Sequence, residues 1–152
     1  MPTNTLPSWE LRPATPDDVE AMAELRAVVM RPDLERLGVY DDHRVRQRLR
    51  NHYAPEHTRI VESEGAFAGC VTARPFEDGR WLENFYLSPA LQGRGIGSAI
   101  LRDLLARTDA EGVPVRLQAL RGSASLRLYE RHGFVREREA PFDVFMVRKP
   151  TP

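Results

Sequence analysis

The sequence predicts one mixed α/β domain: a mostly antiparallel sheet of about six to seven strands, with one parallel pair, flanked by about four helices. Three observations lead to this fold class. Residues 58–87 alternate β-branched or aromatic runs with turn residues, which is typical of an antiparallel meander. A glycine-rich turn, a helical pattern and another strand pattern follow, which is typical of a crossover between parallel strands. Elsewhere, apolar residues recur at helical spacing.

Length and composition limit the class of protein. The chain has 152 residues, which suits a single domain at residues 9–152 after a flexible, Pro- and Thr-rich lead-in at residues 1–8. The formal net charge is zero, so a bulk nucleic-acid-binding role is not expected. The chain has no apolar run of about 18 residues and no signal-peptide pattern at its start, so no membrane partner is expected. The single cysteine, Cys70, fits a cytoplasmic location.

The first part of the chain predicts a strand followed by two helices. Residues 9–14 alternate in polarity, and Thr15 then predicts the N-cap of a helix. Pro32 is expected to end that helix near Met30. Acidic residues at 41–42 predict the start of the second helix.

The middle and the end of the chain predict the remaining elements. Three strands are expected at residues 58–62, 66–74 and 80–87, and Gly69 in the second of them allows a bulge or close packing. Later elements are expected in the order helix, strand, helix, strand, strand, at residues 96–111, 113–120, 123–132, 134–135 onward and 142–148.

The stretch LSPALQGRGIGS at residues 87–98 is the most informative turn. It is not a P-loop, because Gln92 stands where the first glycine belongs and Ser98 where the lysine belongs. It also fits the dinucleotide fingerprint poorly, because that pattern needs a glycine at the position of Ser98 or Ile100.

A third scheme is a helix N-terminus that faces a pyrophosphate. Successive backbone N–H groups without Cβ obstruction form an anion nest, and the helix dipole adds its positive end. Arg94 and Ser98 add side-chain donors. The alternative is a strand-to-helix loop that binds nothing.

The arrangement around this turn favours the third scheme. Gln92-Gly93-Arg94-Gly95-Ile96-Gly97 resembles the pyrophosphate loop of the GNAT superfamily of N-acetyltransferases. Residues 85–89 resemble the fourth strand of that family and its exit, and residues 128–134 resemble its second signature, a tyrosine followed by Gly-Phe. The resemblance covers residues 9–148.

The resemblance implies acetyl-CoA as the acyl donor and a set of residues that bind it. These residues are Phe85, Leu87, Gln92, Gly93, Arg94, Gly95, Ile96, Gly97, Ser98 and Ser123. The chain departs from the family at one corner: many members carry asparagine six or seven residues before the tyrosine, where this chain has Ser123 and Gly122. Serine still donates one hydrogen bond.

Amine acetylation needs a base, because an alkyl amine has a pKa near 10 and arrives protonated. Glu83 is the expected base, since many family members place their base on this strand. In a regular strand Glu83, Phe85 and Leu87 share one face, which directs Glu83 along the path to the thioester. The alternative is that Glu83 is a surface or cross-strand partner.

The leaving thiolate needs a proton or a hydrogen bond. The resemblance implies that Tyr129 supplies it; the alternative is a core tyrosine whose hydroxyl is satisfied. Charge on the thioester oxygen is expected to meet a backbone N–H, at Leu87, where the fourth strand separates from the fifth.

The acceptor is a primary amine of a small molecule or a peptide, and the resemblance places it near residues 30–42 and 136–145. Acidic side chains in that first region, with Tyr40, either attract a cationic amine or serve as helix caps; they are Asp33, Glu35, Asp41 and Asp42. Homodimers are frequent in the family, and Trp81 and Phe142 are the residues expected at a strand edge for such contact.

Other activities compatible with the motifs are O-acetylation and transfer of a longer acyl group. An alternative of another class is a non-catalytic sensor that binds acyl-CoA. Glu83 and Tyr129 favour catalysis over the sensor.

Overall fold

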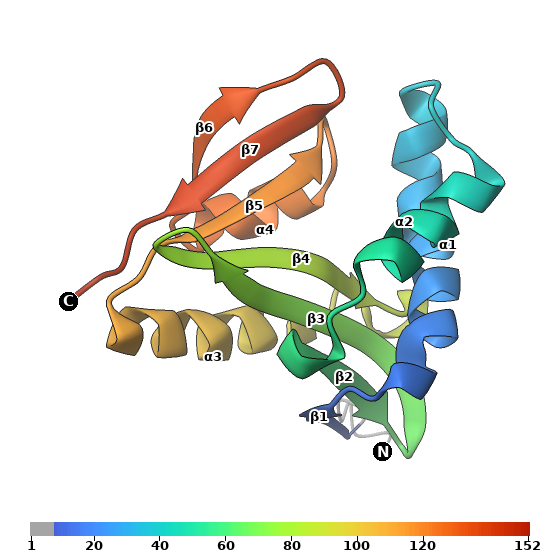
Figure 1. Cartoon of the computed structure of the whole chain (residues 1–152), viewed down its shortest axis with the longest axis horizontal. Helices are drawn as coiled ribbons and strands as arrows, with labels where there is room; N and C mark the ends of the chain where they lie inside the picture. Colours follow the sequence, from blue (N-terminus) through green and yellow to red (C-terminus); the bar gives the residue numbers. More distant parts are fainter. Residues whose placement is uncertain (1–7) are drawn as a thin grey trace, which may run out of the picture.

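A seven-stranded sheet forms the centre of the molecule, in a computed structural model that describes residues 8–152 (Figure 1). Its strands are β1 (Trp9–Pro13), β2 (Thr58–Ser63), β3 (Ala66–Phe76), β4 (Gly79–Leu87), β5 (Val115–Leu120), β6 (Val135–Glu139) and β7 (Asp143–Arg148). They lie in the order β1-β2-β3-β4-β5-β7-β6, and β4–β5 is the parallel pair. The predicted fold class is therefore confirmed. The predicted lead-in lies outside the described residues apart from Ser8.

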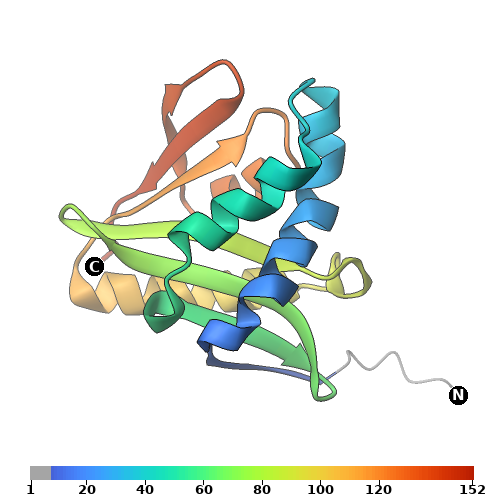
Figure 2. The ribbon, with the colours of Figure 1, turned by 45° about the vertical axis from the view of Figure 1, so that its right-hand side comes forward.

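Helices cover both faces of this sheet. They are α1 (Val19–Arg36), α2 (Asp42–His52), α3 (Ile96–Glu111) and α4 (Ser125–Arg131), and short 3-10 turns lie at Pro16–Asp18, Pro55–His57 and Pro89–Leu91. Figure 2 shows α1 and α2 in front of β2–β4 and α3 behind them. No helix of residues 8–152 combines the length and apolar character that a membrane crossing requires.

The two faces of the sheet bury separate cores. The larger core joins the sheet to α3 and α4, and it includes Leu82, Ile100, Leu117 and Phe134. The smaller core joins the sheet to α1 and α2, and it includes Met22, Leu49 and Cys70. Residue parity along each strand therefore decides whether a side chain meets α3 or α1–α2.

The first helix is longer than the sequence predicts. Thr15 caps the 3-10 turn before α1, as expected, and Asp18 completes the capping box. The predicted end near Met30 is wrong, because Pro32 lies inside α1. A proline inside a helix removes one backbone hydrogen bond. Ion pairs between neighbouring turns, Arg31–Glu35 and Arg36–Asp33, stabilise the helix beyond it.

One of the two residues expected at a strand edge is not at an edge. Trp81 lies on β4, between Arg74 of β3 and Arg116 of β5, so the prediction for Trp81 is wrong. The crossover places β4 in the interior of the sheet by pairing it with β5. Phe142 is exposed just before β7.

A partly buried ion pair fastens the last strand to α3. The Asp109 carboxylate accepts hydrogen bonds from the Arg148 guanidinium at 2.7 and 3.0 Å, and from the backbone N–H and hydroxyl of Thr151 at 3.0 and 2.9 Å. Arg148 Nε also donates to the carbonyl oxygen of His132 at 3.0 Å. The Arg148 guanidinium and the Thr151 donors hold the pKa of Asp109 well below its usual value.

Asp109→Asn should lower the free energy of unfolding at pH 7 by roughly 1–2 kcal/mol, because charge-assisted hydrogen bonds are lost. The folded-state pKa lies below the unfolded value of about 3.9, so this stability is present above pH 4 and is lost as the pH falls further. Urea unfolding at pH 7 and at pH 3 measures the difference, which should shrink at pH 3.

Asp103→Asn is the matched control on the same helix. Asp103 pairs with Arg107 at 3.3 Å, but both side chains are 53% exposed, so its loss should change stability little. Equal effects of the two substitutions at pH 7 would contradict the role of the Asp109 network.

Candidate active site

A β-bulge in β4 decides which side chains face which core. The β3–β4 register shifts between Cys70 and Thr72, and Asn84 on β4 adopts a left-handed φ of 50°. An extra residue on one strand reverses the facing of the residues after it. Glu83 pairs with Thr72 and Tyr86 with Cys70. Glu83 and Tyr86 therefore share the face toward α1 and α2.

The prediction that Glu83, Phe85 and Leu87 share a face is wrong. Phe85 and Leu87 pack on the core beneath α3, whereas Glu83 is directed to the opposite face. The period of two that the prediction assumed holds only in a strand without a bulge.

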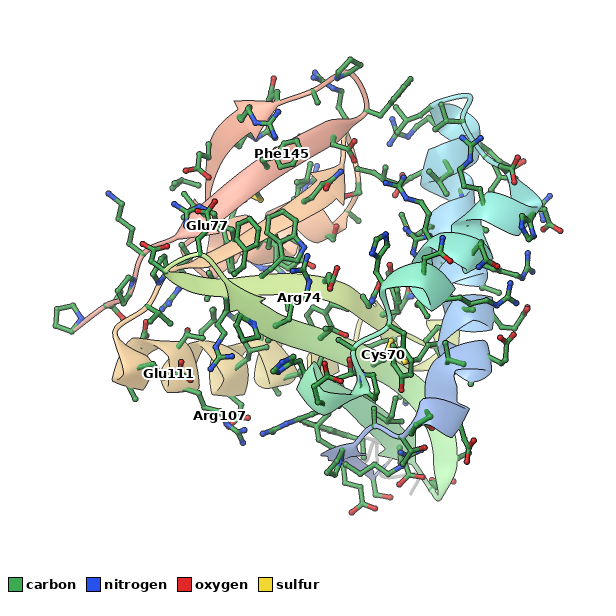
Figure 3. The ribbon with its side chains drawn as sticks, in the orientation of Figure 1. Cys70, Arg74, Glu77, Arg107, Glu111 and Phe145 are labelled. Atoms are coloured by element: carbon green, nitrogen blue, oxygen red, sulfur yellow. The ribbon has the colours of Figure 1, made fainter. Side chains whose placement is uncertain are left out.

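The neighbouring strand is built to accept this bulge. A Cβ atom on Gly69 would lie 2.5 Å from the carbonyl oxygen of Tyr86, so any larger residue would push β3 and β4 apart. The Cys70 thiol donates to the carbonyl oxygen of Asn84 at 3.1 Å. Burial raises the pKa of the Cys70 thiol to about 12, so it stays protonated. Cys70 therefore stabilises the bulge, and Figure 3 shows it on β3.

The parallel strands β4 and β5 separate just before the bulge. Register pairs between β4 and β5 end at Leu82 and Leu117, whereas β5 pairs with β7 along its whole length. The Ser88 N–H donates to the carbonyl oxygen of Ala68 at 2.8 Å. Because backbone groups alternate in direction along a strand, those of Leu87 face the open edge of β4. The carbonyl oxygen of Leu87 accepts from Gln92 Nε2 at 3.0 Å.

The glycine turn lies at the end of this open edge. Gly93 and Gly95 adopt φ values of 73° and 81°, and no atom lies within 4 Å of where a Cβ would stand. At Gly97 a Cβ would make ordinary contacts, the nearest at 3.7 Å from Leu87. The Ile96 side chain is buried in the core, so only its backbone faces the turn.

These features fit a pyrophosphate of acetyl-CoA. The helix α3 has 16 residues and begins at Ile96 after the left-handed Gly95, so its first N–H groups have no partner within the helix. Ser98 lies in its first turn and is 3.3 Å from His132 Nε2. Arg94 lies in this turn beside Gly93 and Gly95, so its role as a further donor, like that of Ser98, stays a prediction.

Tyr129 lies on α4 with its ring buried and its hydroxyl unused. The ring packs edge-on against Phe134 at a centroid distance of 5.5 Å. The hydroxyl makes no hydrogen bond with any residue from Ser8 to Pro152, and it is not among the fully buried polar atoms, so it is accessible to solvent. Burial raises the pKa of Tyr129, so the phenol stays protonated at neutral pH. The alternative for Tyr129, a core tyrosine whose hydroxyl already has a hydrogen-bond partner, does not match this geometry.

The corner that departs from the family is filled by an arginine that the sequence reading missed. Gly122 has a φ of 77°, and a Cβ there would lie 3.1 Å from the Arg36 guanidinium. Arg36, at the end of α1, donates to the carbonyl oxygen of Arg121. The Ser123 and Ser125 hydroxyls form a hydrogen bond at 2.8 Å. Arg36 and this loop are 85 residues apart in the sequence, so no local sequence pattern could have predicted their contact.

Glu83 has a cross-strand ion-pair partner, as the alternative for this residue allowed, although the sequence analysis did not name Arg74. Arg74 Nε lies 2.7 Å from Glu83 Oε1, and the Glu83 side chain is 21% exposed. The Arg74 guanidinium also lies about 6 Å from the rings of Phe76 and Trp81. The predicted meander was the available signal, because it brings residues 74 and 83 to neighbouring strands.

The α1–α2 pair is tied directly to the bulge. Arg26 Nε donates to the hydroxyl of Tyr86 at 3.1 Å, and Arg26 also donates to the carbonyl oxygen of Val45 on α2. The hydroxyl of Tyr86 lies 3.4 Å from the sulfur of Met30. These contacts fix the position of the helices over the face that carries Glu83.

The acidic side chains at the end of α1 and the start of α2 are all engaged within the chain. Asp41 caps α2 by accepting from the backbone of His43 and Arg44. The other three pair with arginines, as Asp33–Arg36, Glu35–Arg31 and Asp42–Arg46. Arg31 also lies over the ring of Tyr40 at 4.6 Å. The capping alternative therefore holds for Asp41, while the other three acids are used in ion pairs that the sequence analysis did not predict. No metal-binding group of His, Cys, Asp and Glu occurs among residues 8–152.

Comparison with known proteins decides the family. A family model described as "Acetyltransferase (GNAT) family" matches residues 19–134, which is more than half of the chain. The chain belongs to the GNAT family of acetyltransferases. It is an N-acetyltransferase that uses acetyl-CoA as its acyl donor. No curated protein matches the sequence significantly.

Solved GNAT structures share the fold at low sequence identity. The PaiA N-acetyltransferase of Thermoplasma acidophilum, in complex with coenzyme A, is 19% identical with a TM-score of 0.76, over 93% of this chain and 99% of that one. The ribosomal-protein-S18-alanine N-acetyltransferase of Escherichia coli is 17% identical with a TM-score of 0.71, over 95% and 96%. The N-acetylglutamate synthase of Neisseria gonorrhoeae is 20% identical with a TM-score of 0.66, over 95% and 36%.

Gly95→Ala should weaken acetyl-CoA binding about tenfold, because a left-handed residue with a side chain costs roughly 1–2 kcal/mol and the turn relaxes away from its nest geometry. Isothermal titration calorimetry measures the change. Gly65→Ala is the control, since Gly65 has a similar φ of 79° in a distant turn with equally open surroundings. An equal loss of acetyl-CoA affinity in both variants would contradict the role of the Gly95 turn.

Proposed function

We propose that this GNAT enzyme acetylates a primary amine of a small molecule or a peptide by direct attack on acetyl-CoA. Glu83 is the general base, and Tyr129 is the general acid. The observation that carries the proposal is the opening between β4 and β5. The glycine turn borders it on the α3 side, and the bulge directs Glu83 to the α1–α2 side.

Donor and acceptor then approach from opposite faces of the sheet. Acetyl-CoA binds along the open edge of β4, where the N–H of Leu87 is placed to stabilise negative charge that develops on the thioester oxygen. The amine enters on the face that carries Glu83. The two substrates meet only where the strands have separated.

The protons balance through two residues. The amine arrives as an ammonium ion, and Glu83 takes one proton, directly or through water. The free amine attacks the thioester carbon, the C–N bond forms and the C–S bond breaks. The second proton of the amine is released as the amide forms, and the sulfur receives one from Tyr129, which is replenished from solvent. The products are the acetylated amine and free thiol.

Family relationships support an amine acceptor and leave its class open. One neighbour is named for a ribosomal-protein alanine, and another was solved with N-acetyl-glutamate. A panel of amines that includes amino acids, alkylamines and peptides, with free thiol followed by a colorimetric reagent, tests the reaction. Failure to bind acetyl-CoA, or to release thiol with any amine, would refute it.

Tyr129→Phe should lower kcat by roughly a hundredfold or more, because a positioned general acid contributes about that factor. The acetyl-CoA Kd should stay within about threefold, since Tyr129 donates to no other described group in the free protein. Steady-state thiol release and calorimetry measure the two quantities. Tyr53→Phe is the control, because it also removes a phenol hydroxyl but away from the site. Tyr53 donates to the carbonyl oxygen of Thr15. Unchanged kcat in Tyr129→Phe would exclude it as the acid.

Glu83→Gln should lower kcat/KM by roughly a hundredfold at pH 7 and by much less near pH 9.5, where more of the amine is already free base. A pH profile of kcat/KM for both proteins measures this. Glu62→Gln is the control, because Glu62 is also ion-paired on the sheet, with Arg12. A loss that is constant from pH 7 to pH 9.5 would show that Glu83 acts in structure and is not the base.

A further inference from the structure

The sheet face that carries Glu83 is left uncovered over β5 and β7. Val115 and Leu117 of β5 are buried against the α3 side, whereas Gln118, which points the other way, is exposed on an interior strand. Its cross-strand partner Phe145 on β7 is only partly buried. Figure 3 shows Arg74 on β3 and Phe145 on β7, with β4 and β5 between them. An interior strand left exposed in this way indicates a binding surface.

A second bulge, in β6, directs the side chain of Arg138 to this face. The β6–β7 register shifts between Arg136 and Arg138. Arg136 pairs with Met146, which faces α4, and its guanidinium lies 3.6 Å from Glu130 of that helix. Arg138 pairs with Phe145 and therefore faces the uncovered side. Without the bulge, the period of two would place Arg138 on the same side as Arg136.

Arg138 is held in place by a ring and has no acidic partner among residues 8–152. Its guanidinium carbon lies 3.9 Å from the centroid of the Phe145 ring. Other arginines of this face are occupied, since Arg74 pairs with Glu83 and Arg116 lies near Asp78 and Glu137. Stacking on an aromatic ring fixes the guanidinium plane and leaves its edge of N–H donors for an oxyanion.

Arg138 lies in one row with the proposed base. Arg138 pairs with Phe145 on β7, and Phe145 pairs with Gln118 on β5. The last register pair between β5 and β4 is Leu117–Leu82, and Gln118 and Glu83 are the next residues on these two strands. Strands in a regular sheet are spaced about 4.8 Å apart, and β4 has separated from β5 after Leu82, so three spacings give roughly 14 Å as the least separation of the two backbones. The Arg138 side chain extends over Phe145 and therefore reaches from β6 across β7, in the direction of Glu83.

The charge of the surroundings agrees with an anionic group on the acceptor. The acids at the end of α1 and the start of α2 are engaged by arginines or by the α2 N-terminus, and Glu83 is paired with Arg74. Asp143 lies on the same face as Phe145, two residues along β7, but forms no ion pair with Arg138. The surface therefore offers a guanidinium for an acid at one end and a base for an amine at the other.

We infer that the acceptor is an amine that also carries a carboxylate, an amino acid or a close analogue, and that Arg138 on its Phe145 platform binds that carboxylate. The inference rests on the proposed function, because it assumes that Glu83 receives the amine. Arg138 contributes binding and orientation, so its removal should act on KM for the acceptor while the acetyl-CoA Kd stays constant.

The test compares matched acceptors. Standard α-amino acids and unbranched ω-amino acids from glycine to 6-aminohexanoate are assayed beside alkylamines and diamines of the same chain lengths, with thiol release as the readout. The expected result is a kcat/KM at least tenfold higher for carboxylate-bearing acceptors. A preference for alkylamines or diamines, or reaction with none of the amino acids by a protein that binds acetyl-CoA, would overturn the inference.

Arg138→Gln then locates the preference. It should raise KM for the preferred amino acids roughly ten- to a hundredfold, with little change in kcat and none for alkylamines. Arg138→Lys should restore part of the affinity, because it keeps the charge but not the planar fork. Arg136→Gln is the matched control, with the same charge change on the same strand but the opposite face.

The outcomes separate the two proposals. Equal KM values in Arg138→Gln and Arg136→Gln, in an enzyme that acetylates amino acids normally, would overturn the role of Arg138 and leave the transfer reaction intact. Absence of acetyl-CoA binding in the wild-type protein would instead refute the proposed function itself. Circular dichroism and the acetyl-CoA Kd of each variant establish that it is folded.

Discussion

The bulge at Asn84 is the constraint on which the rest of the site depends. It places one residue in a left-handed conformation in the middle of a strand, which is costly for a residue with a side chain. Three neighbours offset that cost: Gly69 leaves room for the carbonyl of Tyr86, Cys70 donates to the carbonyl of Asn84, and Arg26 binds the hydroxyl of Tyr86. The larger core, the smaller core and the position of α1 therefore all depend on the same distortion.

This distortion gives the sheet two chemically different faces at one point. Phe85 and Leu87 pack toward α3 and its glycine turn, while Glu83 is directed to α1 and α2. Beyond the bulge β4 no longer pairs with β5, so the backbone N–H of Leu87 is available at the opening. In the proposed reaction, donor binding and acceptor activation occur on opposite sides of one strand, so the ammonium site lies apart from the pyrophosphate site.

A second bulge, in β6, acts in the same way on the acceptor side. It separates Arg136, which pairs with Glu130 on α4, from Arg138, which lies over Phe145. Each bulge interrupts the regular hydrogen-bond ladder and reverses the face to which the following side chains point. Because the acids at the end of α1 and the start of α2 are engaged within the chain, arginine and aromatic side chains organise the open face, with Glu83 held by Arg74.

The sequence alone determined the order of the elements, the antiparallel meander, the parallel pair and the glycine turn, because each depends on local periodicity, capping residues or glycine φ values. It also singled out Tyr129 and Glu83 through the motifs. Tertiary structure decided the length of α1 past Pro32, the face of Glu83 and the partners Arg74 and Arg36. These depend on register shifts and on contacts between segments far apart in the chain, for which a linear pattern carries no signal.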